Sequence, residues 1–445
     1  MEKGRPFAHM VEAENARAWL ESTKERGMAL GLEHTARAIE ALGLPAPAYE
    51  TVHVAGSNGK GTTVAALGSA LHRIGCRHLS FTSPHLVRVE ERVRLDGRPV
   101  STAVFDAALA DVHAMAARTG LSLTFFEVTL LVALVVAADQ RPDVLLLETG
   151  LGGRLDATRA VPADLAIITS LSLEHTDILG GTLEAIAAEK AAIARPMKPM
   201  FVRDVADQGA RRSIQRAAAD AGNPEIGEQP APAQLHWVEI EPEADYFDEA
   251  RAMAAAAWGS LKCAEKAGFP NFRGLHWPGR MHEVVRAGSG QRWLLEGAHN
   301  PSGMETSCRT LERDERWKNP WALLFGSTPQ SRWVPCWNRW STFVAATHPS
   351  PSFSPNLNLD ATPACLARNS QASSLGTTST SARRSPTLKK RWRGSKRSPR
   401  PSPTCCASVH SISQVTSFRP SVQTMTKPFP SWRRTETLKR IHAGR

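Results

Sequence analysis

The sequence predicts an α/β fold in which a large parallel-sheet domain is followed by a smaller, incomplete Rossmann-like α/β domain. Two short apolar runs, at residues 143–148 and 164–169, are typical of strands buried on both faces of a parallel sheet. A glycine-rich turn also joins a short strand to a helix near residue 56. Amphipathic helical patterns accompany these strands at 102–118, 124–139 and 182–194.

The elements around the glycine-rich turn follow in order along the chain. Residues 1–50 carry a helical pattern that ends at Gly43–Pro45, and TVHVAG is then predicted to form a short strand. From Thr62 to Ile74 the apolar residues fall on one helical face. The turn therefore lies between a strand and a helix, which is the setting that a phosphate-binding loop requires.

A second domain is predicted to begin near residue 285. Residues 203–275 give a weak pattern, apart from an acidic, alanine-rich helix candidate at Asp245–Lys262. Candidate strands follow at Trp293–Glu296 and Ala322–Phe325. These strands favour a second α/β unit of which the chain holds only the start.

The tail at residues 331–445 differs in composition from the rest of the chain. It holds 19 Lys and Arg residues and two acidic residues, whereas the preceding 330 residues hold 35 basic and 41 acidic residues. Its Ser, Thr, Pro and Arg content is typical of disorder. Translation out of frame is the second hypothesis, because disordered tails are usually poor in aromatics and this one has Trp333, Trp337, Trp340, Trp392 and Trp432. We expect domains at 1–284 and 285–330, followed by this tail.

The rest of the composition bears on the class of protein. No apolar run of about 18 residues is present, so no membrane span is predicted. The N-terminus lacks a basic stretch followed by an apolar core, and we therefore expect a cytoplasmic protein. The seven cysteines show no Cys-x-x-Cys spacing and predict neither a zinc site nor a disulfide framework. We also expect a monomer.

The stretch HVAGSNGKGTT, from His53 to Thr63, departs from the common phosphate-loop spacing. Val54 stands where the first glycine of Gly-x-x-x-x-Gly-Lys-Ser/Thr belongs, and Gly61 separates Lys60 from Thr62. The physical ingredients remain: glycines for close backbone approach, a lysine, two hydroxyls and a helix N-terminus. These residues are Gly56, Gly59, Lys60, Gly61, Thr62 and Thr63. A glycine-rich turn with a solvated lysine is the alternative.

Other candidate residues lie at strand ends and in turns. Glu148 lies at the carboxyl end of a buried strand, where open α/β sheets place ligands, although a solvent-facing cap is the alternative. By pattern alone, His175 is more typical of a structural histidine and Lys190 of a solvated charge. Ser83–His85 and His299–Pro301 are typical of turns.

Several of these segments together resemble one family. GSNGKGTT resembles the phosphate loop of the Mur ligase superfamily, which are ATP-dependent amide ligases. FTSPHLVRVEERVRLDGRPVS (Phe81–Ser101) is similar to the following segment in folylpolyglutamate synthases and bifunctional dihydrofolate synthases. The resemblance runs from about residue 15 to 330 and is weakest over 203–275. Its further motifs are GLEHTARAIEALGLP, LLLETGLGGRLDAT, SLEHTDILGGTLEAIAAEKAAI, WPGRMHEV and LLEGAHNPSG.

The resemblance implies roles for named residues. Lys60, Lys190 and His299 would serve catalysis, and Lys190 would be carbamylated and help to position the second of two magnesium ions. The residues implied to bind ATP are Gly56, Asn58, Gly59, Lys60, Gly61, Thr62, Thr63, Arg280, Glu296 and Asn300. The residues implied to bind magnesium are Thr62, Glu148, His175 and Lys190, and those implied to shape the pterin side are Ser83, Pro84 and His85. Glu174 and Glu296 stand where the family usually has Asp.

The implied reaction joins L-glutamate to a carboxylate of dihydropteroate, to the γ-carboxylate of folates, or to both. A carboxylate is a poor electrophile, so it would first attack the γ-phosphate of ATP and form an acyl phosphate. The glutamate amine would then displace phosphate. Positioning and electrostatics carry such chemistry, and no nucleophilic triad is needed.

Two other functions stay open at this point. A peptidoglycan-precursor ligase shares the loop and the acyl phosphate, but it usually has a further N-terminal domain, for which the segment before Gly56 leaves little room. The basic, tryptophan-containing tail fits nucleic-acid binding by charge and stacking, although no recognised motif surrounds it. The aberrant tail also raises the hypothesis that the ligase is impaired.

Overall fold

The computed structural model describes most of residues 5–315 and three later strands. The residues left out of the first range are 28, 45, 46, 267, 269, 271, 273, 274 and 289, and the later strands are β11 (Ala322–Phe325), β12 (Pro351–Leu359) and β13 (Thr362–Asn369). Most of the predicted tail therefore lies outside the described residues. No described helix combines the length and apolar character needed to cross a bilayer.

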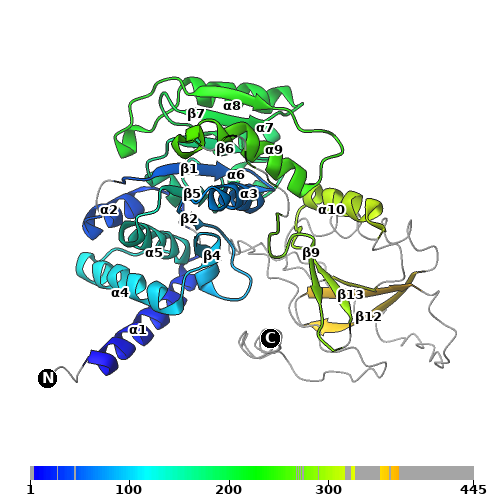
Figure 1. Ribbon diagram of the computed structural model, residues 1–445, viewed down its shortest axis with the longest axis horizontal. Coiled ribbons are helices and arrows are strands. Elements are labelled where there is room, and N and C mark those ends of the chain that lie inside the picture. Colours follow the sequence, from blue (N-terminus) through cyan, green and yellow to red (C-terminus); the bar gives the residue numbers. More distant parts are fainter. Residues whose placement is uncertain are drawn as a thin grey trace, which may run out of the picture.

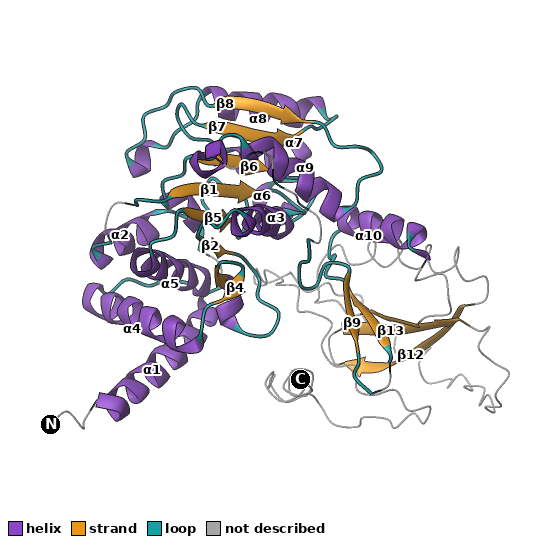
Figure 2. Ribbon diagram, in the orientation of Figure 1, coloured by secondary structure: helices purple, strands orange, loops and turns teal. Residues whose placement is uncertain are grey.

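A mostly parallel sheet of eight strands forms the centre of the described structure, in the order β4-β3-β2-β5-β1-β6-β7-β8 (Figure 2). The six strands from β2 to β8 in this order run parallel, and the short strands β3 and β4 pair antiparallel at one edge. The strand bounds are β1 (Glu50–Ala55), β2 (His78–Phe81), β3 (Val93–Leu95), β4 (Arg98–Pro99), β5 (Val144–Glu148), β6 (Leu165–Ile168), β7 (Pro199–Arg203) and β8 (Gln234–Val238). The predicted α/β fold is confirmed.

Helices cover both faces of this sheet (Figure 1). Their bounds are α1 (Arg5–Ser22), α2 (Glu33–Leu42), α3 (Lys60–Arg73), α4 (Thr102–Thr119), α5 (Phe125–Gln140), α6 (Thr176–Leu179), α7 (Leu183–Ala191), α8 (Gln208–Ala219), α9 (Tyr246–Trp258) and α10 (Pro301–Arg313). In β5, Leu145 and Leu147 pack with the α4 and α5 side, whereas Val144 and Leu146 pack with α3 and α9. The apolar run is continuous because both faces are covered.

The strands predicted at 143–148 and 164–169 are β5 and β6, and the three predicted helices are α4, α5 and α7. The region of weak pattern nevertheless holds α8 and β8. The buried face of α8 includes Ala210, Ile214 and Ala218, so two of these positions are alanines with little apolar signal. The edge strand β8 is half exposed, so its sequence does not need the continuous apolar run that marks a strand buried on both faces.

Beyond the large sheet, β9 (His282–Val285) pairs antiparallel with β10 (Arg292–Leu295), and α10 follows. β10 corresponds to the strand predicted at Trp293–Glu296, and β11 to the strand predicted at Ala322–Phe325. β11 pairs with β13, which pairs with β12, all antiparallel. Strands β12 and β13 thus lie within residues 331–445, the tail whose composition is typical of disorder.

A buried charge cluster holds the chain after α7. Arg159 and Arg195 both pair with Glu228 at 2.6 Å, and both guanidinium groups are almost fully buried. Arg159 also donates from Nε to the carbonyl of Ala192 at 2.9 Å. The C-terminal end of α7, which carries Lys190, is thereby fixed to the loop after β5.

Candidate functional site

The glycine-rich loop, residues 56–59, lies between the end of β1 and the start of α3. Gly56 and Gly59 have φ values of 147° and 86°, which residues with a side chain rarely adopt. A Cβ at Gly56 would lie 1.9 Å from Oγ1 of Thr169. That hydroxyl donates to the carbonyl of Asn58 at 2.6 Å, so the residue after β6 fixes the loop.

Two lysines converge on the carbonyl oxygen of Gly56. Lys60, which begins α3 two residues before the predicted helix start, donates from Nζ at 2.9 Å. Lys190 on α7 donates from Nζ to the same oxygen at 3.0 Å. Burial lowers the pKa of Lys190, Glu174 opposes that shift, and Lys60 adds to it. Two lysines therefore lie beside the loop at the N-terminus of α3, an arrangement that attracts phosphate.

Glu174 balances these charges and was not predicted as a site residue. Its Oε1 pairs with Nζ of Lys190 at 2.9 Å, and both side chains are buried. Burial alone would raise the pKa of this carboxyl, but Lys190 and Lys60 outweigh burial and hold it at about 2. Its only signal in the sequence is its place after a buried strand and beside His175.

Glu148, at the end of β5, contacts the segment predicted to shape the substrate side. Its Oε2 accepts from the backbone N–H of Ser83 at 3.0 Å, and Ser83 is joined to Pro84 by a cis peptide bond. Burial raises the pKa of Glu148, and the nearby Lys60 lowers it in part. In the same segment, Nδ1 of His85 accepts from Nε of Arg92 at 3.0 Å.

The predicted magnesium ligands lie at the end of β5, after β6, on α7 and at the start of α3. Within the described residues, no three His, Cys, Asp or Glu side chains form a ready ligand cluster. Glu148 ends β5 and His175 follows β6, the two strands that flank β1. The side chains of Thr62 and Thr63 are buried, and Thr63 Oγ1 lacks a partner. One carboxylate, a hydroxyl and phosphate oxygens suit magnesium, which keeps few protein ligands. The donor set fits.

Residues just before β9 and between β10 and α10 form a second group of polar side chains at the site. Nη1 of Arg280 pairs with Oε1 of Glu296 at 3.0 Å. Glu296 also accepts from the backbone N–H groups of Met281 and Ala298 at 2.9 and 2.7 Å. Burial and the charge of Arg280 lower the pKa of His299 to about 4, so its imidazole is neutral at pH 7.

Two asparagine amides join the loop to α10. Nδ2 of Asn58 donates to Oδ1 of Asn300 at 3.1 Å, and Nδ2 of Asn300 donates to Oδ1 of Asn58 at 2.9 Å. Asn300 also caps α10 by accepting from Gly303 N–H and donates to Glu174 Oε2 at 3.3 Å. The structure thus brings together predicted residues that lie 242 positions apart.

Two further residues at this junction were missed from the sequence. The hydroxyl of Tyr246, the first residue of α9, donates to the carbonyl of Gly303 and lies 3.0 Å from Ser307 Oγ. The indole of Trp277 covers Gly61, where a Cβ would lie 3.0 Å from its Nε1. Trp277 stands within the quoted WPGRMHEV motif, but nothing in that motif indicates its contact with the loop.

A glycine-rich loop contacted by two lysines, at the carboxyl end of a parallel sheet and beside a second unit, fits a Mur-type ligase. The family model of the Mur ligase middle domain matches residues 54–245. The dihydrofolate synthase/folylpolyglutamate synthase of Escherichia coli is 35% identical over 300 residues, which cover 65% of this chain and 70% of that protein. The chain belongs to the dihydrofolate synthase/folylpolyglutamate synthase family.

Solved structures agree with this assignment. E. coli FolC in complex with DHPP and ADP has a TM-score of 0.54 and 30% sequence identity, covering 67% of this chain and 74% of that one. A bifunctional folylpolyglutamate synthase/dihydrofolate synthase with Mn, AMPPNP and L-glutamate bound has a TM-score of 0.55 and 31% identity, with 67% and 74% coverage. About a third of this chain lies outside these matches.

The lowered pKa of His299 predicts a pH dependence of stability. The unfolded chain binds a proton on this imidazole near pH 6.5, whereas the folded chain resists protonation down to about pH 4. His299 therefore costs no stability above pH 6.5 and destabilises the fold progressively between pH 6.5 and 4, by up to about 3 kcal/mol. Urea unfolding between pH 7.5 and 4.5 should show a weaker pH dependence in His299→Gln than in the wild type. The exposed His34→Gln is the control, and an equal slope in both variants would refute the assignment.

Proposed function

We propose that this chain is an ATP-dependent ligase that adds L-glutamate to dihydropteroate, to the γ-carboxylate of folates, or to both, through an acyl phosphate. The observation that carries the proposal is the convergence of Lys60 and Lys190 on the Gly56 carbonyl, at 2.9 and 3.0 Å. The relatives support the substrates, since one structure holds DHPP with ADP and another holds L-glutamate with AMPPNP.

The loop residues would hold the ATP phosphates. Amide groups at the N-terminus of α3 and the ammonium of Lys60 would bind the phosphates, with Lys60 turning from the Gly56 carbonyl to the ligand. Thr62, Glu148 and His175 would hold magnesium, which when bound neutralises phosphate charge. Glu296, His299 and Asn300 would approach the nucleotide from the second unit, together with Arg280, which pairs with Glu296 from the chain just before β9. The mutual hydrogen bonds of Asn58 and Asn300 would have to open wherever either amide contacts the nucleotide.

Glu148 and the Ser83–His85 segment would connect the nucleotide to the acceptor. The backbone N–H of Ser83 donates to the carboxylate of Glu148. Glu148, a proposed magnesium ligand, would thereby fix the backbone of the segment proposed to bind the acceptor. A carboxylate bound near this contact would lie close to the phosphate loop, as in-line attack on the γ-phosphate requires. The neutral imidazole of His299 would avoid adding positive charge beside Arg280.

Lys190 would be carbamylated in the active enzyme and serve a second magnesium site. Carbamate forms from a neutral amine and carbon dioxide, and burial favours the neutral amine by lowering the pKa of Lys190. The modified side chain would be an anion and could not keep its 2.9 Å pair with Glu174. Glu174 would then turn toward Asn300 or toward a metal ion.

We further propose a cytoplasmic monomer in which residues 1–284 form the ATP-binding domain and 285–330 begin the second domain. The tail at 331–445 would contribute nothing to this chemistry. The tail holds 19 basic and two acidic residues, whereas residues 1–330 hold more acidic than basic residues. Nucleic-acid binding through this tail, with an impaired ligase, is not favoured, because the relatives are folate ligases.

Lys60→Ala should abolish most turnover because it removes the loop cation. We expect kcat to fall by about 100-fold or more, as for other electrostatic groups aimed at developing charge. The assay is glutamate-dependent ADP release with dihydropteroate and, separately, with a folate. Lys198→Ala removes an exposed lysine that pairs with Asp164 and should keep wild-type turnover. Salt-sensitive RNA binding without turnover in the wild type would instead favour the tail.

Lys190 should take up carbon dioxide reversibly. Incubation with ¹³C-bicarbonate is expected to give a carbamate carbon signal in the NMR spectrum of the wild type. The signal should be missing in Lys190→Gln and present in Lys198→Gln. A spectrum of the active enzyme without any carbamate signal would exclude the modification.

The out-of-frame hypothesis for the tail is tested at the level of the gene. Resequencing of the region that encodes residues 320–340 should reveal one inserted or deleted base. Restoring the frame should raise ligase turnover above that of the chain with the basic tail at 331–445. An intact frame, or equal turnover by both chains, would overturn the hypothesis.

A further inference from the structure

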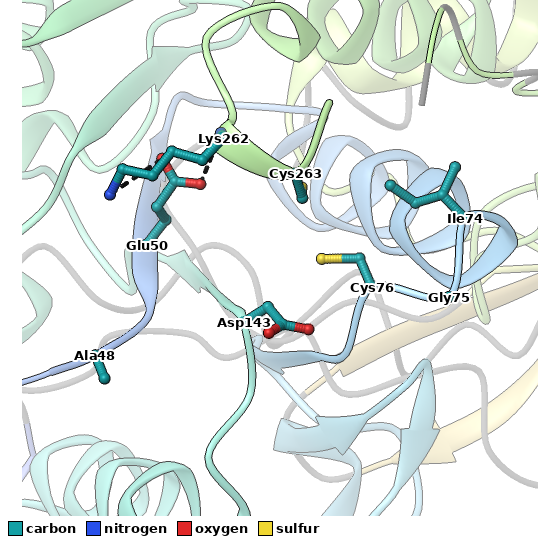
Figure 3. A pocket seen from close by; sticks show the side chains of 8 residues that line it. All are labelled: Ala48, Glu50, Ile74, Gly75, Cys76, Asp143, Lys262 and Cys263. Atoms are coloured by element: carbon teal, nitrogen blue, oxygen red, sulfur yellow. Dashed lines mark hydrogen bonds and ion pairs between the residues drawn. The ribbon is translucent and has the colours of Figure 1, made fainter. Parts of the chain in front are cut away.

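A pocket lies at the amino ends of the central strands β1 and β5, opposite the phosphate loop. It has a volume of about 670 Å³ and is lined by residues at the amino ends of strands (Figure 3). Glu50 is the first residue of β1, and Asp143 directly precedes β5. The phosphate loop follows the other end of β1, so the pocket is separate from the candidate ligase site.

Two cysteines, Cys76 and Cys263, are among the residues that line this pocket. Cys76 follows α3, and Cys263 lies in the short helix η5 (Lys262–Lys266) after α9. Figure 3 shows both side chains in the lining of this pocket. Each thiol also contributes to the shift in the pKa of the other, as expected of two groups in proximity. Cys76 is 8% exposed and Cys263 is partly exposed, so an attacking reagent meets Cys263 first.

The backbone beside each cysteine is fixed by a carboxylate. Oε2 of Glu50 accepts from the backbone N–H of Lys262 at 2.9 Å, which holds η5 against β1. Oδ2 of Asp143 accepts from the backbone N–H of Arg77 at 2.9 Å, which holds the chain after Cys76. The thiols are therefore held in proximity by two separate strands of the sheet, although they lie far apart in the sequence.

We propose that Cys76 and Cys263 form a reversible disulfide by exchange with a small-molecule disulfide such as glutathione disulfide. The Cys263 thiolate attacks one glutathione sulfur, forms a mixed disulfide and releases one glutathione thiolate. The Cys76 thiolate then attacks the Cys263 sulfur, forms the protein disulfide and releases the second glutathione. Both cysteine protons end on the two glutathione thiols, and the two electrons that the cysteines lose reduce the glutathione disulfide.

The neighbours of the pair determine how fast this exchange runs. Burial raises the pKa of both thiols, and Asp143 and Glu50 add to the shifts at Cys76 and Cys263 respectively. Thiolate is the attacking species, so exchange at neutral pH is slow. The ammonium of Lys262 lies 3.9 Å from Oε1 of Glu50 and points away from Cys263 (Figure 3), so it does not offset these shifts.

The disulfide would join the C-terminal ends of α3 and α9. The opposite ends of these helices lie at the candidate ligase site, where α3 begins in the phosphate loop and Tyr246 of α9 contacts α10. Oxidation would thus restrain the helix pair that supports the nucleotide loop. A closed loop of this length restricts the unfolded chain, and the oxidised protein should resist unfolding more strongly.

The test uses the full-length wild-type chain in a glutathione redox buffer. After incubation, free thiols are blocked by alkylation, and the protein is digested without reduction for mass spectrometry. We expect a peptide pair joined through Cys76 and Cys263 that dithiothreitol separates. The pair should disappear in Cys76→Ser and in Cys263→Ser and persist in Cys308→Ser, which removes a buried cysteine of α10.

A stability measurement separates a disulfide of the folded chain from random oxidation. The urea midpoint of the wild type should rise on oxidation and return on reduction, whereas Cys263→Ser should show no such shift. Recovery of Cys76 and Cys263 as alkylated thiols from the folded, oxidant-treated wild type would overturn the proposal. Pairing of Cys263 with any cysteine other than Cys76 would overturn it too.

Discussion

The carbonyl oxygen of Gly56 is the point on which the candidate site depends. Two ammonium groups donate to it, one from the helix that follows the loop and one from α7 on the other side of β1. Such a pair of cations is unfavourable unless a nearby anion compensates for it. Glu174 supplies that charge, and its pKa of about 2 expresses how strongly Lys190 and Lys60 favour its ionised form. A phosphate group would bring the same compensation from the ligand.

The second unit is linked to this charge cluster by hydrogen bonds and by packing. Asn300 donates to Glu174 and exchanges two hydrogen bonds with Asn58, so one side chain contacts both the anion and the loop. Tyr246 adds a contact from α9 to α10, and Trp277 lies against Gly61. Because these partners are short polar or planar groups, a small movement of α10 would change several contacts at once. The position of α10 and the position of the loop are therefore coupled.

The sequence predicted the parts of this structure that have strong local signals. Strands β5 and β6 carry continuous apolar runs, and Gly56 and Gly59 fill positions with positive φ. Helix α8 was missed because alanines form much of its buried face. The contact of Tyr246 with Gly303 spans 57 positions, and no periodicity reports a contact at that distance. Candidate residues within motifs could be proposed from the sequence, whereas the residues that contact them required the fold.

The two departures from the family pattern are satisfied within this chain. Glu174 stands where the family usually has Asp, and its longer side chain reaches Lys190 with Oε1 and Asn300 with Oε2. Glu296 likewise accepts from Arg280, Met281 and Ala298. Burying a carboxylate costs free energy unless hydrogen-bond donors or cations replace the water that it loses. Both glutamates accept hydrogen bonds from the surrounding backbone or side chains, so the cost of burying each carboxylate is compensated within this chain.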